Sequence, residues 1–287
     1  MICAGIDAGS RAIKAVLFDS DRSLILASVL GDQGVEQERL ASELFQKLLQ
    51  EAGVARAEVS GVVATGYGRN AIRFADTTVT EITCHARGVH HLAPGVRTIV
   101  EIGGQDSKVI SLDESGRVRD FAMNDRCAAG TGRFLETLAA RLQMSWEKLA
   151  ALGQQSKKPA LISNTCVVFA ETEIIGLLAE GAPLPDVVAG VQNAIATRVS
   201  AMAGRFTAPP VYFTGGVALQ PGMALALEQV LNHPVQVVPQ PQFTGALGAA
   251  LSAAGVDGSA GPRRQRSTIL GIRAGQKTVG AKTPPEE

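Results

Sequence analysis

Two of the four cysteines in this 287-residue chain have similar sequence settings. Cys127 lies in NDRCAAGTGRF and Cys166 in SNTCVVFAETE, so each follows a polar stretch and precedes a segment that can begin a helix. A thiolate at a helix N-terminus is stabilised by the positive end of the backbone dipole. An iron–sulfur cubane or a structural zinc ion needs four ligands, whereas one chain offers two such thiols. A two-fold dimer would supply four, so the pair predicts a centre shared between two copies.

The remaining cysteines have a plainer interpretation. A cysteine is often only a small buried hydrophobe. This is the prediction for Cys3, in the middle of the first strand, and for Cys84, which stands next to His85. Simple packing also stays open as the alternative for Cys127 and Cys166.

A group of residues recurs at the same spacing in the two halves of the chain. Asp7 and Glu101 are each followed by a glycine, a lysine and an aspartate at the same three offsets. These are Gly9, Lys14 and Asp19 in the first half, and Gly103, Lys108 and Asp113 in the second. Each group covers a strand, a glycine turn and a second strand, which predicts a duplicated domain led by a β-hairpin, with a cleft between the copies.

The glycine turns of these hairpins are suited to binding a polyphosphate. Glycines let backbone N–H groups approach an anion closely, although tight turning alone would also explain them. Asp7 would repel phosphate directly but can hold Mg²⁺ through water. Lys14 and Lys108, on the second strands, can reach either phosphate or solvent. A third glycine turn, Gly215 and Gly216 in VYFTGGVALQ, would let an adenosine lie against the backbone.

The composition predicts an α/β protein packed with small and branched aliphatic side chains. Apolar residues make up 46% of the chain, aromatic residues only 4%, and there are 31 glycines. The formal net charge is zero, so no overall field would recruit nucleic acid or an anionic membrane. No signal-like segment precedes the first strand, no apolar run approaches the roughly 18 residues of a membrane helix, and the cysteines are too few for a disulfide scaffold. These features predict a cytoplasmic protein.

Several motifs resemble those of a known superfamily. Asp7-x-Gly9, GGQDSK, TGGVA and the closing GALGAALSA resemble the superfamily of actin, heat-shock chaperone ATPases and sugar kinases. Within it, ATGYGRN, IGGQDSK, NDRCAAGTGRF and CVVFAETE resemble the activator (component A) of 2-hydroxyacyl-CoA dehydratases and the ATP-binding subunits of benzoyl-CoA reductase. The similarity covers about residues 2–255, and the cysteine motifs are its specific part because generic sugar kinases lack them.

The resemblance implies an α/β fold in which duplicated actin-like ATPase (ribonuclease H-like) domains flank a nucleotide cleft. We expect a first subdomain over 1–94 and a second, carrying the cluster cysteines, over 95–243. A closing helix over 244–255 would pack back on the first subdomain, and 256–287 would be a disordered tail.

The resemblance also implies an ATP-dependent one-electron transfer. Cys127 and Cys166 from both subunits of a homodimer would hold one [4Fe–4S] cluster, while ATP and Mg²⁺ would occupy the cleft. Ferredoxin or flavodoxin would donate the electron, and a CoA-thioester dehydratase or a benzoyl-CoA reductase component would receive it. No nucleic-acid or membrane partner is expected. The alternatives are a small-molecule kinase of the same superfamily and a non-catalytic ATP-binding redox sensor.

Specific residues follow from this interpretation. The expected catalytic residues are Asp7, Glu101 and Gln105, and Asp7 would also hold Mg²⁺ through water. Glu101 stands where the family usually has Asp, so the longer side chain would alter the placement of Mg²⁺ or water. The expected cofactor-binding residues are Gly9, Ser10, Lys14, Gly103, Gly104, Gly130, Gly132, Gly215, Gly216 and Val217.

Overall fold

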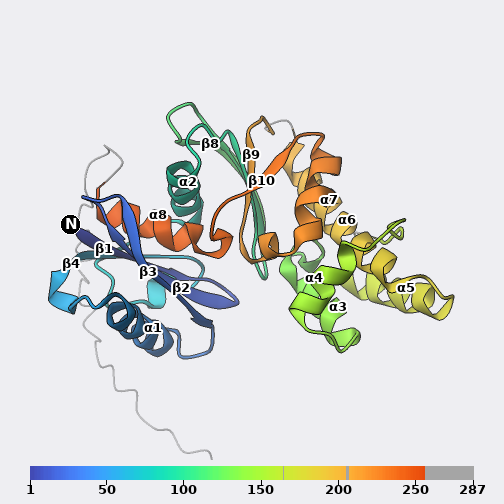
Figure 1. Ribbon diagram of the computed structural model, residues 1–287, viewed down its shortest axis with the longest axis horizontal. Coiled ribbons are helices and arrows are strands. Elements are labelled where there is room, and N and C mark those ends of the chain that lie inside the picture. The colour runs from blue at the N-terminus through green and yellow to red at the C-terminus, as the bar shows by residue number, and fades with distance from the viewer. Residues whose placement is uncertain (164, 205–206, 256–287) are drawn as a thin grey trace, which may run out of the picture.

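The computed structural model describes residues 1–163, 165–204 and 207–255 (Figure 1). The predicted C-terminal tail, 256–287, lies outside these ranges. No helix within them is long and apolar enough to cross a membrane.

Two five-stranded sheets form the frame of the molecule, and they have the same strand order. The first contains β3 (Leu24–Asp32), β2 (Ala12–Asp19), β1 (Ile2–Ala8), β4 (Val59–Thr65) and β5 (Thr77–Thr78). The second contains β8 (Val118–Asn124), β7 (Ser107–Leu112), β6 (Thr98–Ile102), β9 (Val211–Thr214) and β10 (Val235–Val237). In each sheet the first three strands run antiparallel and the last two join in parallel. The predicted duplication is confirmed.

Eight α-helices cover these sheets in the described part of the chain (Figure 1). They are α1 (Gln37–Ala52), α2 (Glu81–Leu92), α3 (Gly132–Arg141), α4 (Trp146–Gly153), α5 (Val167–Ala179), α6 (Leu184–Ala203), α7 (Pro221–Leu231) and α8 (Thr244–Ala253). The helix α1 packs its leucines and Phe45 on the first sheet. The helices α3, α4, α6 and α7 share the large core of the second sheet, and α5 extends from it.

The helices α2 and α8 connect the two halves. The last helix, α8, packs on β2 of the first sheet through Leu247 and Leu251, whereas α2 packs on the second sheet through Val89. The two helices meet backbone to backbone, because a Cβ on Gly88 would overlap the carbonyl group of Thr244, and one on Gly248 would overlap that of Cys84. This close approach places the first turn of α8 against the second turn of α2, between the two sheets.

The two cysteines predicted to be packing residues are buried. Cys3 lies in β1 and Cys84 in α2, and both side chains are fully enclosed. Burial raises the pKa of the Cys84 thiol to about 12. The packing prediction for both is confirmed.

Candidate functional site

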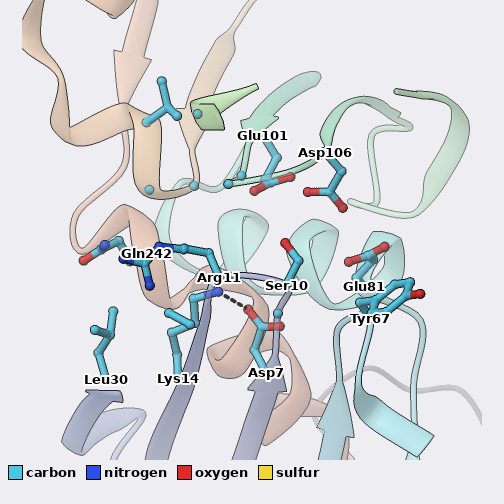
Figure 2. Close-up of a pocket in the computed structure, with 18 of the residues that line it drawn as sticks. Asp7, Ser10, Arg11, Lys14, Leu30, Tyr67, Glu81, Glu101, Asp106 and Gln242 are labelled. Carbon is cyan, nitrogen blue, oxygen red and sulfur yellow. Dashed lines mark hydrogen bonds and ion pairs between the residues drawn. The ribbon is translucent and has the colours of Figure 1, made fainter. Parts of the chain in front are cut away.

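A cavity of about 530 Å³ lies between the two sheets, where the tips of both hairpins meet. In Figure 2, Asp7 and Lys14 point into it from the first sheet, and Glu101 and Asp106 point into it from the opposite side. Its volume is within the range of small-molecule sites. The residues predicted from the sequence that line it are Asp7, Gly9, Ser10, Lys14, Glu101, Gly103, Gly104, Gly132, Gly215, Gly216 and Val217.

Apart from the two cysteines, two of the predicted site residues do not line this cavity. Gln105 is exposed at the hairpin tip, and its neighbour Asp106 lines the cavity instead. Gly130 lies against the side chains of Arg198 and Asn124, close to Cys127 in sequence. A catalytic role for Gln105 and a cofactor role for Gly130 stay predictions.

On the first hairpin, the carboxylate of Asp7 faces its cross-strand neighbour Lys14. The two residues are paired in the β1–β2 register, and Lys14 Nζ donates to Asp7 Oδ2 at 3.2 Å. The turn between them is tight, because Gly9 N donates to Ala12 O at 3.1 Å. Asp7 is 5% exposed, so its carboxylate is presented to the cavity and to little else.

On the second hairpin, the equivalent lysine is sealed inside a cluster of carboxylates. Lys108 Nζ donates at 2.8 Å to both Glu101 and Asp106, and it lies 3.7 Å from Glu81 of α2. Burial alone would lower the pKa of Lys108, but its three carboxylate partners outweigh burial and raise it. Burial raises the pKa values of Glu81 and Asp106. The option that Lys108 reaches solvent is therefore wrong, since it is 1% exposed.

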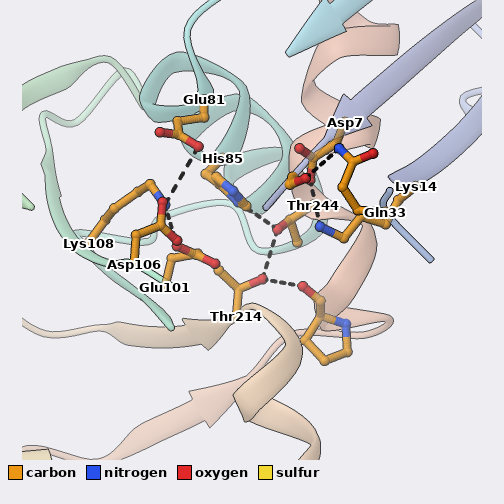
Figure 3. Close-up of polar contacts among 12 residues, drawn as sticks. Asp7, Lys14, Gln33, Glu81, His85, Glu101, Asp106, Lys108, Thr214 and Thr244 are labelled. Atoms are coloured by element: carbon orange, nitrogen blue, oxygen red, sulfur yellow. Dashed lines mark hydrogen bonds and ion pairs between the residues drawn. The ribbon is translucent and has the colours of Figure 1, made fainter. Parts of the chain in front are cut away.

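A hydrogen-bonded chain that was not predicted from the sequence crosses from α2 to β9. His85 Nδ1 lies 2.9 Å from Thr244 Oγ1, which lies 2.8 Å from Thr214 Oγ1, and Thr214 donates to Pro241 O at 2.7 Å (Figure 3). Burial lowers the pKa of His85 to about 4, with nearby Lys108 acting in the same direction. The spacing of Glu81 and His85, one helical turn apart, was the only sequence signal for this face.

Hydrogen bonds link the second hairpin to the segment that follows Cys127. Gly132 N donates to Gly103 O and Arg133 N to Gly104 O, both at 2.9 Å. These two donors belong to the first turn of α3, whose N–H groups have no partner within the helix. The capping residue, Thr131, donates through Oγ1 to Ala128 O at 3.0 Å. The glycine turn at the cavity is therefore only a few bonded steps from Cys127.

The loops that carry Cys127 and Cys166 touch each other. Cys127 Sγ lies 3.9 Å from the carbonyl oxygen of Thr165, the residue before Cys166, and both thiols are partly exposed. Cys166 caps the N-terminus of α5, as the sequence suggested. Cys127 instead precedes a short 3₁₀ turn, Ala128–Gly130, and α3 begins only at Gly132. Within the described ranges, no three His, Cys, Asp or Glu side chains are grouped as metal ligands.

An apolar surface lies beside Cys166 on α5. Val168 is 68% exposed, Phe169 71% and Ile175 45%. Their spacing along α5 places them on adjoining faces of the helix. Apolar side chains exposed together in this way are typical of a surface that another chain covers.

Comparisons with known proteins agree with this architecture. The activator of lactoyl-CoA dehydratase from Anaerotignum propionicum is 42% identical over 258 residues, which are 88% of this chain and 97% of that protein. The (R)-2-hydroxyglutaryl-CoA dehydratase activating ATPase from Acidaminococcus fermentans is 41% identical over 255 residues, 87% of this chain and 95% of that protein.

A solved structure extends the likeness to three dimensions. The activator of 2-hydroxyisocaproyl-CoA dehydratase from Clostridium difficile, with bound ADPNP, superposes with a TM-score of 0.84 and is 41% identical, covering 89% of this chain and 95% of that one. The predicted duplicated actin-like fold is thereby confirmed. Residues 4–253 match the BadF/BadG/BcrA/BcrD ATPase family, and the chain belongs to that family.

Proposed function

We propose that this protein is an ATP-driven activator that passes a single electron to a CoA-thioester dehydratase or reductase in the cytoplasm. The main support is the set of hydrogen bonds between the glycine turn of the second hairpin and the segment that follows Cys127. Gly103 and Gly104 accept hydrogen bonds from the first turn of α3, and Thr131 connects that turn to Ala128, next to Cys127. A nucleotide that moves the second hairpin therefore also pulls on the segment that holds this thiol.

The two thiols fit a shared [4Fe–4S] cluster. Cys127 and Cys166 are partly exposed, their loops are in contact, and Cys166 stands at a helix N-terminus, where a negatively charged group is favoured. Together with the same two cysteines of a second copy they would provide four thiolates. When bound, the cluster would supply the one-electron carrier. The exposed Val168 and Phe169 beside Cys166 are suited to being covered by that second copy.

The cavity fits ATP with a magnesium ion. The backbone of Gly9 and Ser10 on one side, and of Gly103 and Gly104 on the other, lines it from both hairpins. Backbone N–H groups at such turns favour phosphate, and those of Ser10 and Gly104 are the candidates, because Gly9 N and Gly103 N already donate within their turns to Ala12 O and Asp106 O. Asp7 would hold Mg²⁺ through water, and the adenosine would lie against Gly215–Val217. These residues come from both halves, so a bound nucleotide would hold the halves together and close the cleft by a hinge motion.

The partners follow from the proposed chemistry. The three relatives named above are activators of CoA-thioester dehydratases. A ferredoxin or flavodoxin would reload the activator with one electron. Moving an electron uphill by about 0.2 V requires roughly 5 kcal/mol, taking about 59 mV and 1.4 kcal/mol per tenfold step. Nucleotide binding and hydrolysis can supply energy on that scale.

Anaerobic purification tests the proposal directly. We expect close to four irons per dimer, a visible absorption band that bleaches on reduction, and loss of both in Cys127→Ser and in Cys166→Ser. The matched control is Cys3→Ala, which removes a buried thiol of the same chain and should leave the iron content unchanged. A colourless, iron-free dimer that still hydrolyses ATP would refute the electron-transfer function.

Coupling between ATP and the cysteines needs a second measurement. With the iron-loaded protein, ATP should speed the removal of iron from the cluster by a chelator. A non-hydrolysable analogue should have the same effect, because binding alone moves the hairpin. Gly104→Val places a side chain against Arg11 at the hairpin tip, and we expect it to weaken this response. An identical chelation rate with and without nucleotide would contradict the coupling.

A further inference from the structure

The hydroxyl protons of Thr214 and Thr244 fix the direction of every hydrogen bond in the chain that ends at His85. Pro241 O can only accept, so Thr214 must use its single hydroxyl proton on that carbonyl, at 2.7 Å. The 2.8 Å contact between Thr214 and Thr244 then requires Thr244 to be the donor. Thr244 has no further proton, so it must accept from His85 Nδ1 at 2.9 Å.

This ordering assigns the tautomer of a buried imidazole. Nδ1 carries the proton, and the neutral ring therefore has its lone pair on Nε2, at the opposite edge. That edge and the carboxylate of Asp7 both border Gly245, where a Cβ would lie 3.3 Å from His85 Nε2 and 3.0 Å from Asp7 Oδ2. His85 itself lines the cavity. Burial opposes a second proton on the ring, and so do the charges of Lys108 and Lys14, which outweigh the opposite effect of Asp7 and Asp106 on the pKa of His85.

We propose that Nε2 of His85 is the hydrogen-bond acceptor that orients the attacking water during ATP hydrolysis, and that the Thr244–Thr214–Pro241 chain holds the ring in the required tautomer (Figure 3). This inference rests on the proposed hydrolysis of ATP in the cavity. It is independent of the cluster and of the electron acceptor.

The chemistry of the step balances without charging the ring. One O–H of the water donates to Nε2, which turns an oxygen lone pair towards the γ-phosphorus. The new P–O bond forms as the bond between the γ-phosphorus and the β–γ bridging oxygen breaks. ATP⁴⁻ and H₂O give ADP³⁻ and H₂PO₄⁻, so both water protons stay with the phosphate product. His85 is neutral before and after, and its role is orientation.

If His85 had only a structural role, it would need only its Nδ1 contact to Thr244. Two substitutions test the roles of Nδ1 and Nε2 separately. His85→Asn places an amide near the position of Nδ1 and can keep the contact to Thr244, but it has no atom at Nε2. His85→Gln places its amide near Nε2. We expect His85→Asn to lower kcat roughly 100-fold with KM for ATP nearly unchanged, and His85→Gln to retain clearly more activity. Equal kcat values in the two variants, or a wild-type rate in His85→Asn, would overturn the proposal.

A second pair of variants changes Thr214, which does not contact the cavity. Thr214 is buried and is not among the cavity residues. Thr214→Val removes the hydroxyl at constant shape, which frees the proton of Thr244 to point at His85 and favours the Nε2–H tautomer. Thr214→Ser keeps the hydroxyl and is the control. We expect kcat to fall at least tenfold in Thr214→Val and little in Thr214→Ser, again with KM for ATP nearly unchanged.

NMR can determine the tautomer of His85 in the absence of nucleotide. Two-bond ¹H–¹⁵N NMR correlations of ¹⁵N-histidine-labelled dimer distinguish the two forms, and the His85 signals are those missing from His85→Gln. We expect the Nδ1–H form in the wild type and a mixture or the Nε2–H form in Thr214→Val. The Nε2–H form in the wild type would overturn the inference even if the variants fail to fold. A wild type that shows the Nδ1–H form but does not hydrolyse ATP would instead refute the proposed function.

Discussion

Asp7 and Glu101 occupy the same position in two copies of one hairpin, and each lies opposite a lysine on the neighbouring strand. The strand registers pair Asp7 with Lys14 and Glu101 with Lys108. The two pairs differ in what covers them. Both lysines border the cavity, but Lys108 is held by further carboxylates from α2 and the hairpin turn and its side chain is 2% exposed, whereas that of Lys14 is 18% exposed. In the second hairpin, Lys108 is thus part of a buried ion cluster, whereas in the first hairpin Lys14 can contact a ligand.

This difference predicts unequal stability losses for the same substitution. Lys108→Met would leave buried carboxylates without their cation and should lower the free energy of unfolding by about 3–5 kcal/mol. Lys14→Met leaves only one carboxylate, Asp7, without its cation, and that carboxylate faces the open cavity, so the loss should be clearly smaller. Urea unfolding of both variants measures the difference. Equal losses would mean that the carboxylates around Lys108 do not depend on its charge.

Stability should also depend on pH through His85. The pKa of His85 is about 4 in the folded protein and about 6.5 in an unfolded chain. Between these two values the unfolded state binds a proton at His85 that the folded state does not bind. This contribution is complete above pH 6.5 and is lost as the pH falls towards 4, amounting to about 3 kcal/mol. The slope of unfolding free energy against pH over this range should be shallower in His85→Gln. An unchanged slope would contradict the burial of a neutral ring.

The cysteines should fall into two reactivity classes. In reduced, iron-free protein, iodoacetamide should modify Cys127 and Cys166, which are partly exposed, and spare Cys3 and Cys84, which are enclosed. Mass spectrometry of peptides after brief labelling locates the modified residues. Unfolded protein, labelled on all four, is the control. Rapid modification of Cys84 in the folded state would show that α2 and α8 separate readily.

Two helical glycines should respond in opposite ways to alanine. Gly248→Ala forces a methyl group onto the backbone of Cys84, so α2 and α8 must separate, and we expect a loss of about 1–3 kcal/mol or more. Gly176 of α5 has open space at the same position, and Gly176→Ala should stabilise the helix by up to about 1 kcal/mol. Thermal unfolding of the two variants gives the comparison. Destabilisation by both would mean that α5 is closely covered at Gly176.

The local parts of the fold could be predicted from the sequence because their interactions are short in range. The offset of seven residues that links Asp7 to Lys14 and Glu101 to Lys108 is the cross-strand pair of a hairpin. Alternation and glycine turns determine such a register. The cap position of Cys166 was predictable for the same reason, since a cap depends on the next few residues.

The site itself depended on contacts between distant segments. His85 and Thr244 are 159 residues apart, and the loops of Cys127 and Thr165 are 38 residues apart. Glu101 and Asp106 are near Lys108 in the sequence or across the hairpin, but the third carboxylate, Glu81, reaches Lys108 only because α2 lies over its end. By itself the sequence determined the paired hairpins, the glycine turns and the two cysteines as the residues able to do chemistry. Only the tertiary structure decided which charges are buried together and which nitrogen of His85 meets Thr244, because burial and hydrogen-bond partners are set by whatever the rest of the chain packs against a side chain.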